Sequence, residues 1–339
     1  MAVVFDIVHT TKYVYKKPVS FGEHKVMFRP RASHDMRVLA TDLRVSPSAH
    51  VRLVQDVHSN SVALVQPLEP ASTLEIVCSF TVEHVGTFNL ELPLDPSAMS
   101  YPFEYSPDDR FALQPDMIAS TPDKEGKLLK WAWQFIKPPL PQPGTNTPPT
   151  SVQSAAGAGQ RAGQAGPSVS LAPTVATVAS NAPPVSNTAR DVLVRMNEFI
   201  RNNFEYAARE TPGTQSPLET LALGSGSCRD FAMLMIEAVR RLGYAARFVS
   251  GYLYSPALDG EDAPGTIGAG ATHAWLHVYL PGAGWVPFDP TNNLTGGTNL
   301  IRVGEARDAA HAAPVSGSWS GDPEDFVGLE VDVQVRRRL

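Results

Sequence analysis

The stretch that decides the fold is GSGSCRDFAMLMIEAVRRLGYAARFVSGYLY, residues 224–254. After Cys228, apolar residues recur at the three- and four-residue steps of an amphipathic helix: Phe231, Leu234, Met235, Ala238, Val239 and Leu242. Gly243 stands where such a helix commonly ends, and a strand-like segment follows it. The sequence therefore predicts a buried helix that begins at Cys228 and leads into a strand.

The residues that follow predict an antiparallel hairpin. THAWLHVYL, residues 272–280, and GWVPFDPT, residues 284–291, read as strands joined by a tight turn. A helical stripe over residues 189–206 precedes Cys228, and an alternating strand, residues 328–337, lies near the C-terminus. We therefore expect residues 190–339 to form a core in which helices pack on an antiparallel sheet.

Residues 1–104 predict an antiparallel β-sandwich. The clearest strand is STLEIVCSFTVEHV, residues 72–85, in which an apolar face alternates with a mostly polar one. Further short strands are separated by Pro, Ser, Asn and Asp turn residues, a spacing typical of a sandwich. The predicted fold class is thus α+β, a sandwich followed by the core.

Two segments connect these parts. Residues 105–137 contain a helical pattern that we expect to pack on or between the domains. Residues 138–189 are dominated by Pro, Ala, Gly, Ser, Thr and Val, with Arg161 as their only charged residue. Because such a composition buries too little apolar area to offset its ordering entropy, it predicts a flexible linker without catalytic residues.

The overall composition limits the possible classes of function. With 339 residues, of which 43% are hydrophobic, the chain is long enough for two buried cores, and its net charge of −6 gives no reason to expect nucleic acid or an anionic membrane as partner. The first residues lack a secretory-signal pattern, no stretch is long enough to span a membrane, and only two cysteines occur. We therefore expect a cytoplasmic protein, with neither a metal nor another cofactor.

Cys228 occupies a chemically distinctive position, the first turn of a helix that follows a flexible Gly-Ser run. Free backbone amides and the positive end of the helix dipole favour a thiolate there. Cys78, in contrast, points inward from a predicted strand and is interpreted as inert core. Cys228 is therefore the candidate nucleophile.

A thiolate nucleophile needs a base, and the base needs an acceptor that orients it. His273 lies near the start of one hairpin strand and Asp289 near the end of the next, so pairing brings them together if they share a face. His277 projects from the same face as His273 but further from the open end of the hairpin, which makes it a rival base.

Three strings in the second half resemble the bacterial transglutaminase-like cysteine peptidases, a branch of the papain-like superfamily. They are residues 224–254, THAWLHVYLPGAGWVPFDPTNN at residues 272–293 and RDAAHAAPVSGSW at residues 307–319. VHTTKYVYKKPVSFGEHKVMFRPR, residues 8–31, is similar to the β-rich domain that precedes the core in this family. The resemblance covers nearly everything outside residues 138–189.

The resemblance implies a hydrolase that cleaves a peptide or amide bond in a peptide or protein substrate through a thioester. It implies Cys228 as nucleophile, His273 as base and Asp289 as the residue that orients it.

Other positions match the family less well. Tyr206 resembles an aromatic site of the family and is a candidate oxyanion donor, and we place Arg229 and Trp275 at the substrate mouth. Ala222 stands where papain has a glutamine, and Ala309 replaces the aromatic residue of the family's Arg-Asp-Tyr string.

Three alternatives remain open. If an amine replaced water in the second step, the same residues would form a protein-glutamine acyl transferase; no calcium-loop pattern such as an EF-hand accompanies them. A non-catalytic binding module is the second alternative. The third is a zinc site made by Cys228, His273 and His277, which lacks the usual paired ligands at short spacing.

Overall fold

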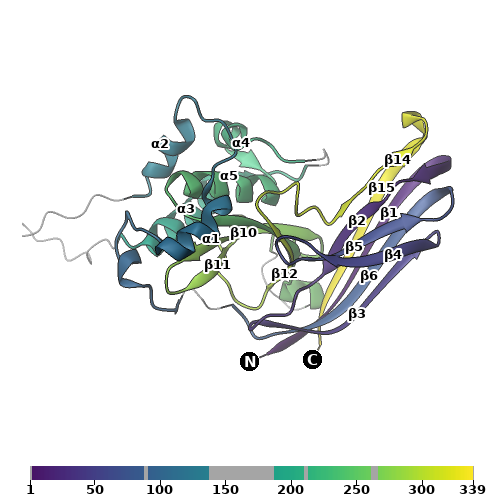
Figure 1. The fold of residues 1–339 in the computed structure, drawn as a ribbon, viewed down its shortest axis with the longest axis horizontal. Helices are drawn as coiled ribbons and strands as arrows, with labels where there is room; N and C mark the ends of the chain where they lie inside the picture. Colours follow the sequence, from purple (N-terminus) through teal and green to yellow (C-terminus); the bar gives the residue numbers. More distant parts are fainter. Residues whose placement is uncertain (1, 88–90, 137–186, 210–212, 261–265, 339) are drawn as a thin grey trace, which may run out of the picture. The chain divides into compact units, whose positions relative to one another are not determined.

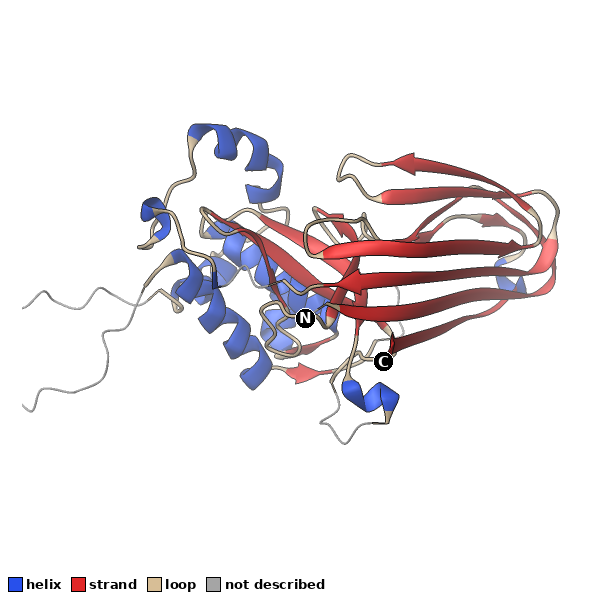
Figure 2. Ribbon diagram, turned by 90° about the horizontal axis from the view of Figure 1, so that it is seen from below, coloured by secondary structure: helices blue, strands red, loops and turns tan. Residues whose placement is uncertain are grey.

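The computed structural model describes residues 2–87, 91–136, 187–209, 213–260 and 266–338. They belong to one compact unit, and nearly all of the predicted linker lies outside them. Three antiparallel sheets and one parallel pair of short strands occur among the described residues. Two of the sheets pack against each other, and helices gather beside the third (Figures 1 and 2). The predicted α+β class is confirmed.

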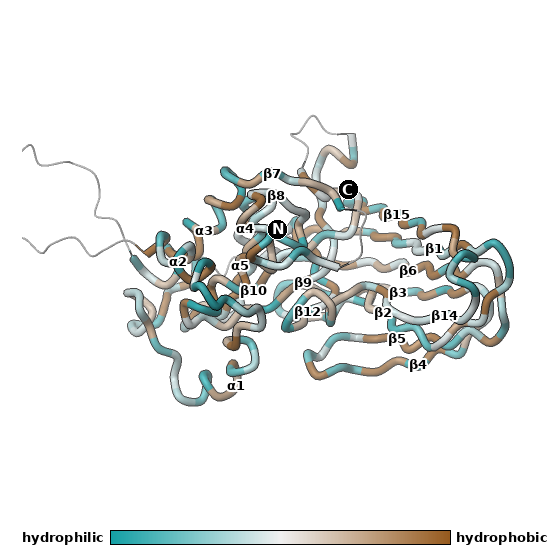
Figure 3. Tube along the Cα trace, turned by 90° about the horizontal axis from the view of Figure 1, so that it is seen from above, coloured by the Kyte–Doolittle hydropathy of each residue, from teal (hydrophilic) through white to brown (hydrophobic). Residues whose placement is uncertain are grey.

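Two antiparallel sheets form the sandwich. The first has the order β14-β1-β6-β3, with β15 also paired to β1, and the second has the order β13-β2-β5-β4. Apolar and polar residues alternate along the long strands (Figure 3), so that Phe5, Ile76 and Phe80 of the first sheet pack with Val26 and Val65 of the second. The strand bounds are β1 Val3–Phe21, β2 His24–Arg29, β3 Met36–Ser46, β4 Ala49–Gln55, β5 Ser61–Pro67, β6 Ala71–His84, β13 Val315–Ser316, β14 Trp319–Ser320 and β15 Phe326–Arg338.

The C-terminal strand β15 belongs to the sandwich. It pairs with β1 from Val4↔Arg338 to Tyr15↔Phe326, and β13 and β14 also join the sandwich sheets. Assigning all of residues 190–339 to the core is therefore corrected for these strands. Pairing with β15 satisfies an edge of β1 that would otherwise be open.

The core is built around α5, Cys228–Arg241, as predicted. This helix packs on an antiparallel sheet with the order β11-β10-β9-β12, and the apolar side chains of both form one buried cluster. The other core elements are α1 Pro107–Met117, α2 Lys127–Trp133, α3 Ala189–Asn203, α4 Pro217–Leu223, β7 Glu205–Tyr206, β8 Ser225–Gly226, β9 Ala246–Leu253, β10 Thr272–Leu280, β11 Gly284–Phe288 and β12 Leu300–Ala306; short 3₁₀ turns lie at Pro96–Ala98, Pro256–Asp259 and Pro323–Asp325.

A buried ion pair joins the sandwich to the core. The Arg302 guanidinium on β12 contacts both carboxylate oxygens of Asp35, at 2.8 and 3.0 Å, and Thr87 donates to the same carboxylate at 2.8 Å. Burial alone would raise the pKa of Asp35, but the hydrogen bonds and charge of Arg302 outweigh it and hold that pKa well below its usual range. Asp35 is thus ionised and paired at neutral pH.

We predict that Asp35→Asn lowers the free energy of unfolding by about 3 kcal/mol, because it removes the carboxylate that accepts two hydrogen bonds from the largely buried Arg302 guanidinium and leaves that guanidinium with Glu305, at 3.2 Å. Since the carboxyl pKa is lower in the folded chain than in the unfolded chain, the wild-type contribution is present above about pH 4 and is lost as the pH falls. Urea unfolding at pH 7 and at pH 3 measures both effects.

Asp42→Asn is the matched control for this ion pair. Asp42 pairs with Arg44, but these two side chains are 52% and 80% exposed, so removing that charge should change the stability by less than about 1 kcal/mol. If both variants lost the same free energy of unfolding, the buried pair would have no special stabilising role.

Candidate active site

Cys228 is the first residue of α5 and is 8% exposed. The turn before it is held by Asp230, whose carboxylate accepts hydrogen bonds from the backbone N–H and hydroxyl of Ser227 at 2.9 and 2.8 Å. The same carboxylate accepts from the Gln215 backbone at 2.7 Å and pairs with Arg209 at 3.0 Å. Asp230 therefore fixes the start of the helix, and with it the sulfur, from a completely buried position.

His273 and Asp289 are brought together by the predicted hairpin. His273 Nε2 lies 2.9 Å from Asp289 Oδ2, and the two residues are 2% and 0% exposed. Asp289 also accepts from the Thr291 backbone at 2.9 Å and from the Asn292 amide nitrogen at 2.9 Å. Three donors therefore hold a carboxylate that burial would otherwise penalise.

The second nitrogen of His273, Nδ1, is not used by Asp289. Among the described residues this nitrogen has no hydrogen-bond partner. Cys228 belongs to the electrostatic surroundings of the imidazole and favours its protonated form. Burial lowers the pKa of His273, but the charge and hydrogen bond of Asp289, assisted by Cys228, outweigh it and raise the pKa above its ordinary value.

His277, the rival base, lies in a different environment. It is 6% exposed, and its Nδ1 is 3.6 Å from a Glu305 carboxylate oxygen. Burial dominates the nearby charges and lowers the pKa of His277 to about 4, so it is neutral at pH 7. The hydrogen bond to Asp289 is made by His273 and not by His277.

Two of the residues expected around the sulfur, Tyr206 and Trp275, differ in burial. Tyr206 is half-buried on β7, paired with Gly226 two residues before the cysteine; burial and then the charge of Cys228 raise the pKa of this phenol, and Arg229 opposes them. Trp275 is only 1% exposed and packs behind His273, with ring centroids 6.1 Å apart. The expected place of Trp275 at the substrate mouth is therefore corrected to the core.

Asn292 is a site residue that the sequence did not reveal. The motif Asp-Pro-Thr-Asn-Asn is typical of a simple turn, whereas the Asn292 side chain contacts both Asp289 and the backbone of Ile267. The two consecutive asparagines after Asp289 were the available signal, but no local pattern connects them to a residue 25 positions earlier in the chain.

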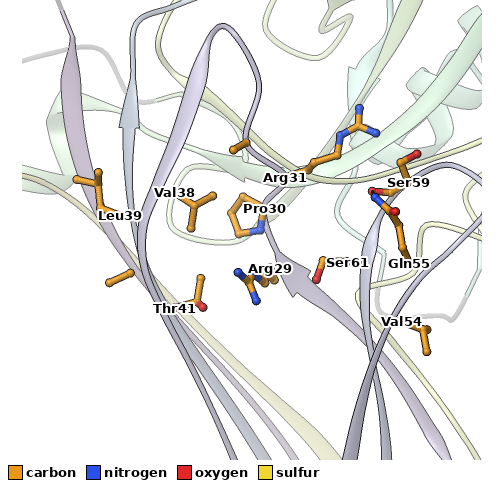
Figure 4. A pocket seen from close by; sticks show the side chains of 12 residues that line it. Arg29, Pro30, Arg31, Val38, Leu39, Thr41, Val54, Gln55, Ser59 and Ser61 are labelled. Atoms are coloured by element: carbon orange, nitrogen blue, oxygen red, sulfur yellow. Dashed lines mark hydrogen bonds between the residues drawn. The ribbon is translucent and has the colours of Figure 1, made fainter.

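The second cysteine and a cavity in the sandwich lie away from this site. Burial raises the pKa of Cys78 to about 12, in agreement with an inert thiol. A cavity of about 490 Å³ opens between the edges of β3 and β4 in the sandwich, lined by Arg29, Arg31 and other residues (Figure 4). Neither Cys228 nor His273 borders it.

Within the described part of the chain, no group of three or more His, Cys, Asp or Glu side chains is arranged to hold a metal ion. Among these residues there is also no helix with the length and apolar character needed to cross a membrane.

Comparison with known proteins identifies both regions of the chain. Residues 5–83 match the bacterial transglutaminase-like N-terminal region, and residues 177–290 match the transglutaminase-like superfamily. The uncharacterized protein ML0607 of Mycobacterium leprae is 25% identical over 331 residues, 98% of each chain. The uncharacterized protein Rv2569c of Mycobacterium tuberculosis is 34% identical over 155 residues, which are 44% of this chain and 48% of the relative.

A solved structure shares the fold. A candidate cysteine protease from Cytophaga hutchinsonii superimposes with a TM-score of 0.61 at 20% identity, over 99% of this chain and 91% of that one. The two family matches therefore identify a transglutaminase-like core, typical of a family of cysteine-dependent enzymes, behind a bacterial transglutaminase-like N-terminal region. The family resemblance inferred from the sequence is confirmed.

We predict that Asp289→Asn moves the acid limit of Cys228 alkylation to higher pH, by roughly 1–3 pH units. The charge of Asp289 raises the pKa of His273, so its loss lets the imidazolium that stabilises the thiolate deprotonate earlier. The rate of iodoacetamide labelling of Cys228, followed by peptide mass spectrometry from pH 5 to pH 10, measures this limit.

Asp308→Asn is the control, because it removes the carboxylate of another His-Asp pair in the chain, the exposed His311–Asp308 contact of 2.7 Å. This variant should keep the wild-type profile. An unchanged profile in Asp289→Asn would mean that the buried pair does not act on the cysteine.

Proposed function

We propose that this protein is a cysteine-dependent hydrolase that cleaves a peptide or amide bond, with Cys228 as nucleophile, His273 as acid and base, and Asp289 as the residue that orients the imidazole. The observation that carries the proposal is the divided use of the His273 ring: Nε2 is bonded to buried Asp289, and Nδ1 is unpartnered among the described residues while Cys228 acts on the ring. These observations support a nucleophile, a base and a group that orients the base as the roles of the three residues.

In the first step the thiolate of Cys228 attacks the substrate carbonyl carbon, forming a carbon–sulfur bond and an oxyanion. The backbone N–H of Cys228 at the start of α5 is the expected oxyanion donor, because helix N-termini present free amides, and half-buried Tyr206 is a candidate for the second donor. His273 then gives its Nδ1 proton to the departing amine as the carbon–nitrogen bond breaks, which leaves a thioester and a neutral imidazole.

In the second step His273 accepts a proton from water at the same nitrogen while the water oxygen attacks the thioester. Collapse of this intermediate releases the carboxylic acid and restores the thiolate–imidazolium pair. Asp289 stays ionised throughout and stabilises the imidazolium in both steps. The raised pKa of His273 supports this role, since it favours the protonated ring that must donate first.

Acyl transfer is the competing outcome, because the family match includes transglutaminases by description. The same residues would join the acyl group to a primary amine if the amine reached the thioester before water. A peptide or protein substrate and a cytoplasmic location stay predictions from the sequence.

We predict that Cys228→Ala lowers peptide or amide cleavage on the order of 10⁴-fold, because the bond-forming atom is removed. Screening a peptide library with the wild type, Cys228→Ala and the control Cys78→Ala, each analysed for new termini by mass spectrometry, measures the loss. The control changes a cysteine whose thiol burial keeps protonated, so it should keep wild-type activity per folded molecule.

Adding a labelled primary amine to the same reactions separates the two outcomes. Free carboxylic acid as the main product supports hydrolysis, and covalent incorporation of the label into glutamine side chains would assign the protein to the acyl transferases instead. Equal activity of wild type and Cys228→Ala would refute both.

A further inference from the structure

The loop after β11 is closed tightly behind Asp289. The backbone of Asp289 pairs with that of Leu294 in both directions, at 2.8 and 3.2 Å, which confines the residues between them to a short turn. Asn293 takes a positive φ of 56° in this turn, and its side-chain oxygen accepts a hydrogen bond of 2.9 Å from completely buried Asn197 on α3. Asn292, at the end of the turn, is therefore held on a fixed backbone.

The Asn292 amide connects two parts of the site. Its nitrogen donates to Asp289 Oδ2, at 2.9 Å, and to the Ile267 carbonyl, at 3.0 Å, while its oxygen accepts from the Ile267 N–H at 3.0 Å. A carboxylate only accepts and a backbone N–H only donates, so these three contacts fit a single orientation of the amide. Asp289 Oδ2 is shared between this amide and the imidazole of His273.

The residue after Ile267 lies against the Nδ1 edge of the imidazole. Gly268 has a φ of +85°, and a Cβ added there would be 2.7 Å from His273 Nδ1. Only glycine combines this left-handed backbone with such a close approach. The backbone of Gly268 thus borders the nitrogen that would carry the proton.

We propose that Asn292 is a positioning residue that sets the Asp289 carboxylate and the Ile267–Gly268 backbone in one fixed relation to His273. Through Asp289 it orients the ring from the Nε2 side, and through Ile267 it places Gly268 as a wall beside Nδ1. This role rests on the proposed function, because it concerns the path of the proton between thiol, leaving amine and water.

Each contact of Asn292 has its own effect on the position of the His273 ring. A third donor to Asp289 keeps the carboxylate oxygen in line with the ring, and small displacements at a proton-transfer site cost large factors in rate. The wall at Gly268 leaves the ring no space to turn toward the loop, so the imidazole keeps Nδ1 available for the thiol. Asn292 controls both, because one amide makes both sets of contacts.

The test uses the rate at which iodoacetamide labels Cys228 in the full-length protein, which needs no natural substrate. Asn292→Ala should slow labelling at neutral pH by roughly 10- to 100-fold and move its acid limit to higher pH, because Asp289 no longer supports the imidazolium in line. Gly268→Ala should slow it to a similar degree by displacing the ring.

Gly270→Ala is the matched control for the second variant. Gly270 also has a positive φ, of 74°, but a Cβ there meets only Leu258 Cδ2, at 3.3 Å. The backbone strain is comparable, so this variant should label at the wild-type rate per folded molecule, with the folded fraction measured by thermal unfolding.

The outcomes separate this inference from the proposed function. If wild-type Cys228 labels no faster than an ordinary thiol, the proposed function fails. If the wild type labels rapidly and Asn292→Ala keeps both its rate and its pH profile, losing only stability, the positioning role is refuted while the proposed function stands.

Discussion

Complete burial of α5 is the constraint on which the rest of the structure depends. Every residue from Asp230 to Arg240 is buried, which places the sheet on one side of the helix and α1 to α4 on the others. Such a helix has little freedom to shift, because each displacement would open cavities or create overlaps in a close-packed interior. The sulfur at its first turn is therefore held by the whole core and not by its immediate neighbours alone.

Charges on α5 explain why the connecting segment before the linker folds against it. Glu237 is completely buried and accepts hydrogen bonds from the backbone of Ser120 and Thr121, while Arg240 donates to the Asp116 carbonyl. Burial would raise the pKa of Glu237, but these donors and Arg241 lower it to about 2. Leaving the glutamate without them would cost several kcal/mol, about 3–5 by analogy with broken buried pairs, so the loop between α1 and α2 completes the core.

The sequence predicted those helices and strands in which apolar residues repeat at short, regular steps, because this repeat shows which face is buried. The helix from Cys228 and the hairpin that joins His273 to Asp289 were predicted because their apolar faces repeat within a few residues. The pairing of β15 with β1 was not predicted. These strands come from opposite ends of the sequence, and the pattern of residues in one strand does not show which distant strand it pairs with. Strand β4 carries no alternation of buried and exposed residues, because nearly all of its residues are exposed. The role of Asn292 was not predicted, because its contacts depend on a loop that only the fold brings near.

The competition between water and an amine at the thioester follows from the single open nitrogen of His273. The leaving amine and the incoming nucleophile must both exchange a proton with Nδ1, so they occupy the same place in succession. An amine at this place would attack the thioester and give its proton to Nδ1. The result is a new amide, so the reaction is the reverse of the first step with a different amine. Gly268 borders this nitrogen, so in the proposed mechanism a small nucleophile has the advantage over a lysine side chain carried on a folded protein. This steric difference supports hydrolysis within that proposal, because the triad itself acts on water and on an amine in the same way.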